Sequence, residues 1–398
     1  MASSHLSYRS DLRFSFQAFF SLGFRPFFLF GALFSVILML GWTFQLRGIP
    51  FPHASVVNYY PGVLWHSHEL IFGFATAIIS GFLLTAVGNW TGQKMLNGTW
   101  LAALVLLWIS GRIVPFLPLE PLVVALVDLA FYPLLTLAIA VPILKSANLR
   151  NMVFIAFCGL LFLMNLLVHF DRLGIAPGMS HLGIYGALNI IVLVMLIIGG
   201  RVIPFFTERA THDYQGRQIP WVEKLILPVA VVTFLNDLWQ PLAIWANALS
   251  GLLALLLLMR VGGWFDRRIL SNPLLWILHA GYLMLGLGFL LRATLPWSGL
   301  SPFIYIHALT VGGIGLLALG MMSRVSLGHT GRPLQLPTPI KVAFYSLLVA
   351  VIARVFAMAA VQKPFLYDLS ATAWMLAFGL FAVVYLPALV SPRADGKG

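Results

Sequence analysis

Residues 69–88, ELIFGFATAIISGFLLTAVG, carry one charge at their first position and are otherwise apolar or small. A stretch of about twenty such residues is long enough to cross the hydrocarbon core of a bilayer as a helix. The stretch is solidly apolar, whereas the strands of membrane barrels alternate apolar and polar residues. A helix also satisfies its own backbone hydrogen bonds, which lipid requires. This stretch therefore predicts a transmembrane helix.

Similar segments recur along the chain of 398 residues, of which 60% are hydrophobic and only 9% are charged. Soluble domains are about 25% charged, so the composition excludes a water-soluble globule. We predict an all-α polytopic membrane protein with twelve transmembrane helices in a single integral membrane domain, residues 1–398. The predicted spans lie near 27–46, 69–88, 98–116, 121–144, 151–170, 182–206, 221–239, 241–260, 273–292, 302–322, 340–361 and 369–391.

The positive charges predict the orientation of these spans. With the N-terminus placed inside, only six of the 24 Lys and Arg residues fall outside: Arg47, Arg112, Arg172, Arg292, Arg354 and Lys363. Cytoplasmic loops are enriched in Lys and Arg, so we expect a multi-pass protein of the bacterial inner membrane with both termini cytoplasmic. The net charge of +12 is spread singly between spans, so membrane lipid is the expected partner and nucleic acid is not.

Histidines in apolar spans need a partner, because an ionisable group in lipid is costly unless it is paired or bound to a metal. His66 and His68 open the span at 69–88 in the string WHSHE. On one helix their side chains would point about 200° apart, so they could not share a metal ion. Neutral imidazole suits iron, copper and zinc alike. One of the two is therefore predicted to lie before the first turn of the helix or to serve a different centre, with an interfacial pair beside Trp65 as the alternative.

A second histidine helix is expected near the end of the chain. His307 lies near the start of the span at 302–322, at a depth similar to that of His68. Residues 68–92 align without a gap with residues 307–331, with histidine matched at one end and Thr-Gly at the other. This register predicts a parallel internal repeat, which would place two similar helices around one axis. Chance similarity between glycine- and leucine-rich segments is the alternative.

Other ionisable residues are weaker candidates. His279 and His329 lie toward the inner ends of their spans and could form a second site, although the position of His329 also suits a solvated residue. Asp128, well inside a span, is expected to be a proton-pathway group or the partner of an arginine. The five remaining histidines are expected at the surface: His5, His53, His169, His181 and His212.

Arginines at span ends are candidates for binding an anion. A guanidinium near hydrocarbon pairs with a carboxylate, a carbonyl or a ligand anion such as a haem propionate. The alternative is that each extends to the lipid headgroups. The three predicted cofactor-binding arginines are Arg112, Arg201 and Arg324, and Arg354 is a fourth arginine within a span.

Four blocks of this sequence resemble the NnrS family of bacterial nitric-oxide physiology. They are GFRPFF (23–28), WHSHELIFGF with GFLLTAVGNWTG (65–92), GGRVIPFFT (199–207) and HALTVGGIG with SRVSLGHTGRP (307–333). These blocks extend from the first span to beyond the tenth, so the resemblance covers nearly the whole chain. It implies an inner-membrane protein that contains haem and copper and is linked to denitrification and to tolerance of nitric oxide.

The histidine-containing motifs of the family match this sequence at four positions, so the resemblance implies candidate metal ligands at His66, His68, His307 and His329. His279 is a further candidate. His68 and His307, on helices that run in the same direction, are the predicted axial ligands of one b-type haem. Copper would then bind at His66 or His279.

The resemblance implies a haem and copper protein that binds or turns over nitric oxide or its iron complexes and protects against nitrosative stress. A haem-dependent oxidoreductase reaction would need an electron donor, which the sequence does not identify. A secondary transporter fits the twelve spans and the repeat, and an assembly factor for a respiratory or denitrification complex is a third hypothesis.

Overall fold

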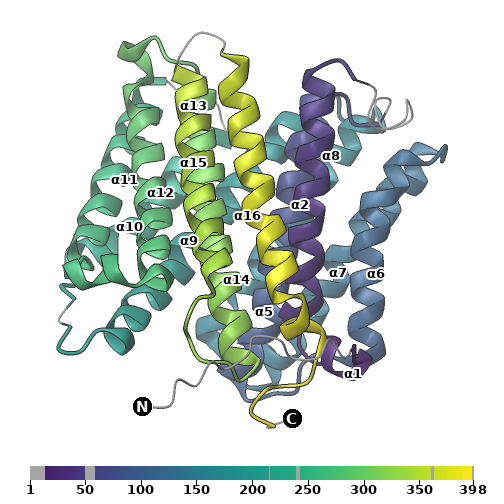
Figure 1. Ribbon diagram of the computed structural model, residues 1–398. Coiled ribbons are helices and arrows are strands. Elements are labelled where there is room, and N and C mark those ends of the chain that lie inside the picture. Colours follow the sequence, from purple (N-terminus) through teal and green to yellow (C-terminus); the bar gives the residue numbers. More distant parts are fainter. Residues whose placement is uncertain (1–13, 50–58, 215, 239–242, 360–362, 397–398) are drawn as a thin grey trace.

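The computed structural model describes residues 14–49, 59–214, 216–238, 243–359 and 363–396, and within these residues helices are the only regular elements (Figure 1). The first half contains α1 (Phe16–Phe19), α2 (Phe24–Leu46), α4 (Val63–His68), η1 (Glu69–Ala75), α5 (Thr76–Thr91), α6 (Gly98–Ile113), α7 (Pro121–Lys145), α8 (Val153–Arg172) and α9 (Met179–Ala210). The second contains α10 (Pro220–Leu238), α11 (Ala243–Gly263), α12 (Pro273–Ser298), α13 (Phe303–His307), η5 (Ala308–Gly315), α14 (Leu316–His329), α15 (Thr338–Ala359) and α16 (Pro364–Val390).

The all-α membrane fold predicted from the sequence is confirmed. Within the described residues, eleven helical stretches are long and apolar enough to span a membrane. The remaining predicted span, 221–239, is not among these eleven. It coincides with α10 as far as Leu238 but carries three charged residues, Glu223, Lys224 and Asp237. It is therefore a helix of 19 residues that is less apolar than the others.

The two ends of the helical bundle lie on the same side. The amide of Ser15, just before α1, donates a hydrogen bond of 2.9 Å to the carbonyl of Val390, the last residue of α16. Figure 1 shows α1 and the end of α16 at the same lower end of the bundle. The less apolar helix α10 contacts both α9 and α11, so it packs as part of the same bundle.

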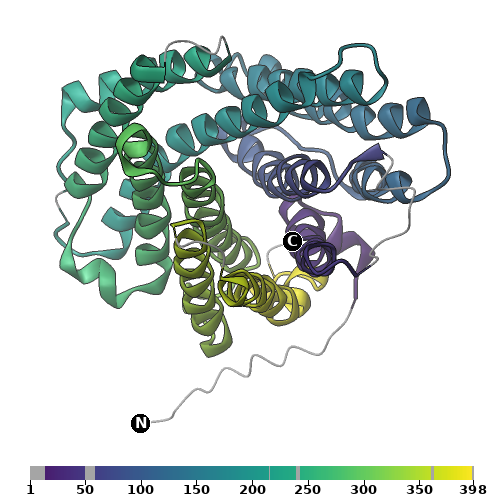
Figure 2. The ribbon, with the colours of Figure 1, turned by 90° about the horizontal axis from the view of Figure 1, so that it is seen from above.

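The last helix packs against the first spanning helix. α16 contacts α2, and seen end-on the yellow α16 lies beside the purple α2 (Figure 2). Arg25 near the start of α2 fastens this contact, because its Nη1 donates to the carbonyls of Leu389 (2.9 Å) and Ser391 (2.7 Å). These carbonyls belong to the C-terminal end of α16, where no intrahelical donor remains for them.

Replacing Arg25 with alanine is expected to lower the free energy of unfolding by about 1–3 kcal/mol, the cost of leaving buried acceptors without a donor. Denaturant unfolding in detergent micelles measures this. Arg47→Ala is the matched control, because Arg47 pairs with Asp368 at the exposed surface and such pairs contribute about 0–1 kcal/mol. Equal losses in the two variants would contradict the role assigned to Arg25.

The two histidine helices share an unusual feature. Each changes from α-helix to π-helix immediately after its aligned histidine, at Glu69–Ala75 after His68 and at Ala308–Gly315 after His307. They are also the two most buried of the eleven candidate spans. The π-helix is rare and occurs frequently at functional sites. The shared register of these segments supports the internal repeat predicted from the sequence.

Candidate metal centre and ligand cavity

A cluster of polar side chains lies buried in the first half of the bundle, where α4 and η1 meet α6, α7 and α8. Its charged, imidazole and amide side chains are at most 6% exposed. We call it the buried polar network, and it consists of Tyr59, Tyr60, His68, Glu69, Arg112, Asp128, Asn165 and His169.

Arg112, near the end of α6, links the two carboxylates of the network. Its Nη1 donates to Glu69 Oε2 at 2.8 Å, and its Nη2 donates to Asp128 Oδ1. Two glycines make room for this pairing. A Cβ atom at Gly73 would lie 2.9 Å from Glu69 Oε2, and one at Gly111 would lie 2.7 Å from Asp128 Oδ1. Arg112 therefore has carboxylate partners, one of the alternatives that the sequence left open.

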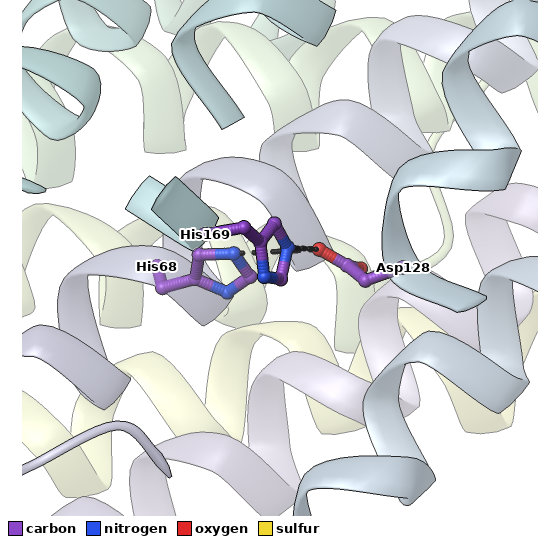
Figure 3. Close-up of side chains that lie close together, drawn as sticks. All are labelled: His68, Asp128 and His169. Atoms are coloured by element: carbon purple, nitrogen blue, oxygen red, sulfur yellow. Dashed lines mark hydrogen bonds and ion pairs between the residues drawn. The ribbon is translucent and has the colours of Figure 1, made fainter. Parts of the chain in front are cut away.

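Two imidazoles face Oδ2 of Asp128, the carboxylate oxygen that Arg112 does not bind (Figure 3). Asp128 Oδ2 lies 3.0 Å from His169 Nε2 and 3.5 Å from His68 Nε2. The other ring nitrogens have partners of their own, since His68 Nδ1 lies 3.0 Å from Glu69 Oε1 and His169 Nδ1 lies 2.6 Å from the Tyr59 hydroxyl. Two nitrogens and one carboxylate oxygen thus converge on one point.

The network carries an excess negative charge. Glu69 and Asp128 contribute two negative charges and Arg112 one positive charge, so the sum is −1 when both histidines are neutral. Tyr60 adds no charge, because burial raises the pKa of its hydroxyl well above the ordinary value, and this hydroxyl lies 3.1 Å from His68 Nε2. A buried unbalanced charge is costly, so this site favours an additional positive charge.

The prediction that His169 lies at the surface is wrong, since its side chain is 0% exposed. The sequence did hold a signal for it. Asn165 and His169 are four residues apart in an otherwise apolar helix, so they lie on one face of α8. His212 is exposed as expected, and His181 is also exposed, whereas His5 and His53 lie outside the described residues.

A large cavity lies beside the network, at the opposite end of the bundle from the contact between Ser15 and Val390. Its volume is about 930 Å³, and its walls are formed by eight elements: α2, α4, η1, α9, α13, η5, α15 and α16. Most of the lining is apolar. The titratable side chains on it include His66, His181, His307, Arg354, Tyr367 and Asp368.

Two histidines and one arginine provide this cavity with nitrogen atoms that could bind a metal or an anion: His66, His307 and Arg354. His307 Nδ1 lies 2.7 Å from the carbonyl of Phe303, which fixes its proton on Nδ1 and leaves a lone pair on Nε2. That Nε2 accepts from Arg354 Nη2 at 2.9 Å. His66 stacks on Trp42 with 4.4 Å between ring centroids, and its Nδ1 is buried with no hydrogen-bond partner among the described residues.

The cavity joins His307 to His66 and not to His68. His68 is absent from the cavity lining and belongs to the buried polar network. His66 and His68 thus lie in two different sites, the cavity and the buried polar network. A haem bound by both His68 and His307 does not fit this arrangement, because only His307 lines the cavity.

The other predicted site residues lie elsewhere. His279 Nδ1 donates to the carbonyl of Leu275 at 3.0 Å, and the ring of His329 lies 5.7 Å from that of Phe24. Within the described residues, no hydrogen bond or ring contact joins the two histidines.

The two remaining predicted arginines have protein partners away from the cavity. Arg201 Nη1 donates to Asn151 Oδ1 at 3.1 Å. The guanidinium of Arg324 lies 3.9 Å from the ring centroid of Phe206. Neither arginine lines the cavity, whereas Arg354 does.

These features define a class of protein: a multi-pass helical membrane protein with a buried histidine–carboxylate cluster and a cofactor-sized cavity on one side. The chain matches the family described as NnrS protein over residues 18–393, nearly its whole length, and it belongs to that family. No curated protein matches the chain significantly. It is accordingly a membrane protein of a family linked to nitric oxide.

Proposed function

We propose that this protein contains haem and copper in the bacterial inner membrane, binds nitric oxide or its iron complexes, and limits nitrosative stress. The observation that carries the proposal is the cavity that presents His66, His307 and Arg354 together. With both termini cytoplasmic, as the distribution of Lys and Arg favours, this cavity opens toward the outer side of the membrane.

The residues of the cavity fit a b-type haem. Cofactor sites occupy roughly 300–1,000 Å³ and are mostly apolar with a few polar groups, as here. Imidazole is a common ligand of haem iron. The lone pair of His307 Nε2 accepts from Arg354 Nη2 at 2.9 Å, and it would become available to the iron once Arg354 bound another group. Arg354 would pair with a propionate. The unpartnered Nδ1 of His66 is a second feature that a bound group would explain.

The haem would supply an iron atom that binds nitric oxide, and the chain's residues would set its surroundings. His307 would be a ligand of the iron, with its tautomer fixed by the carbonyl of Phe303. The apolar walls would exclude water, while Arg354 would provide the positive charge near the ligands. Turnover of nitric oxide would require an electron donor.

An optical spectrum of the purified protein tests this function. We expect a Soret band that shifts when nitric oxide is added to the reduced protein. His307→Ala is expected to lose most of the haem, measured as the haem-to-protein ratio. His181→Ala is the control, since His181 lies exposed at the rim of the same cavity and is not placed as a ligand.

Two outcomes would contradict the proposal. A colourless protein that catalyses ion-coupled uptake in proteoliposomes would make it a transporter. A colourless protein that copurifies with a respiratory or denitrification complex would make it an assembly factor.

A further inference from the structure

The three donor atoms of the buried polar network are arranged as metal ligands are. His68 Nε2, His169 Nε2 and an oxygen of Asp128 all lie within 4.8 Å of one another, from three different helices (Figure 3). All three side chains are at most 2% exposed. A single ion placed among them would contact two imidazoles and one carboxylate, a donor set that transition metals accept.

The surroundings of the two imidazoles also match a metal site. A metal-bound histidine almost always donates its other N–H to a carboxylate, a carbonyl or another acceptor. His68 Nδ1 faces Glu69, and His169 Nδ1 faces the hydroxyl of Tyr59. These contacts direct both Nε2 atoms toward Asp128, and with the proton of each ring on Nδ1 the Nε2 lone pairs would be available to a bound ion. Arg112 in turn holds Glu69 and the far oxygen of Asp128 in place.

Without a metal ion, His68 has hydrogen-bond acceptors at both ring nitrogens. Its Nδ1 lies 3.0 Å from Glu69 Oε1, and its Nε2 lies 2.9 Å from Asn165 Oδ1. The amide nitrogen of Asn165 donates to Asp128 at 2.8 Å, which leaves the Oδ1 atom of Asn165 as an acceptor. A neutral imidazole carries one N–H and can donate to only one of these two acceptors. A positive ion at Nε2 would interact with the other and would also balance the net charge of −1 on the network.

We infer that His68, Asp128 and His169 bind a transition-metal ion, and we assign copper to this site. The donor geometry is independent of the proposed function, and only the choice of copper rests on it. A copper(I) ion would make the network neutral. Because His66 and His68 belong to the same short helix α4, this metal site and the haem cavity would be positioned by one element.

Metal analysis of the haem-loaded protein tests the site. We expect about one copper per chain beyond any bound elsewhere, and an electron paramagnetic resonance spectrum of the oxidised protein with coupling to two imidazole nitrogens. His169→Gln and His68→Gln should each lose this copper while retaining haem. Glu69→Gln, which removes the carboxylate behind His68, should weaken copper binding by about 10–100-fold.

Matched controls separate the site from folding and from the haem. His181→Ala should keep its copper, and His307→Ala should lose haem but keep copper. Each variant is compared by helicity and gel filtration. Unchanged copper content in folded His68→Gln and His169→Gln would overturn the site. Wild-type protein with no metal here would show that a proton balances the network instead, and zinc in place of copper would overturn the choice of metal.

Discussion

Replacing Arg112 with methionine is expected to lower the free energy of unfolding by about 3–5 kcal/mol, the cost of leaving a buried ion pair without one partner. Glu69 and Asp128 are both 2% exposed and both bind this guanidinium. Methionine replaces most of the volume, so loss of charge dominates the effect. Denaturant unfolding in mixed micelles measures it, with the yield of folded protein from membranes as a second readout.

A double variant shows whether charge is the cause. Adding Glu69→Gln to Arg112→Met removes one of the two stranded negative charges, so the double variant should be more stable than Arg112→Met alone. Arg268→Met is a control for a guanidinium that pairs only at the surface, with Asp266. If the double variant is less stable than the single variant, the ion-pair explanation fails.

Replacing Thr310 with tryptophan is expected to lower the haem-to-protein ratio by at least about tenfold, because a steric cost of about 1.4 kcal/mol is enough for that factor. Thr310 lines the cavity from η5, and its hydroxyl donates to the carbonyl of Ile306 in the preceding helix α13. The indole would project into space that the haem needs, and overfilling a packed site typically costs about 1–3 kcal/mol.

Ile352→Trp is the matched control for this substitution. Ile352 is 56% exposed on α15, so the indole would face lipid outside the cavity. It should leave haem binding unchanged. If Thr310→Trp binds as much haem as the wild type while remaining folded, the haem lies elsewhere. Copper content should stay constant in both variants, because neither residue contacts the buried polar network.

The sequence predicted the helices well because each apolar span is a local feature. The stretch at 69–88 is long enough and apolar enough to be read without knowledge of the rest of the chain. The weakest member of the set, α10, was also found, since its apolar centre is flanked by charges only near its two ends. Its contacts with α9 and α11 became clear only from the structure.

The site was harder to predict because its geometry depends on contacts between distant helices. Asp128 and Arg112 were recognised as groups in need of partners, and they prove to bind each other. His169 was missed because it lies near the end of its span, next to Asp171 and Arg172, where a surface position was a reasonable interpretation. Nothing local shows that α8 turns it toward α7. The volume of the cavity likewise depends on the packing of eight helical elements.

A π-helical segment follows each of the two aligned histidines, His68 and His307. It determines the direction in which the side chains before it point, relative to the rest of the helix. Removing one residue from Glu69–Ala75 would restore the ordinary α-helical winding and rotate the preceding segment by about 100°. Such a rotation would carry His68 away from Asp128 and His66 away from the cavity at the same time. The additional residue in the π-helical segment therefore keeps His66 in the wall of the cavity and His68 beside Asp128.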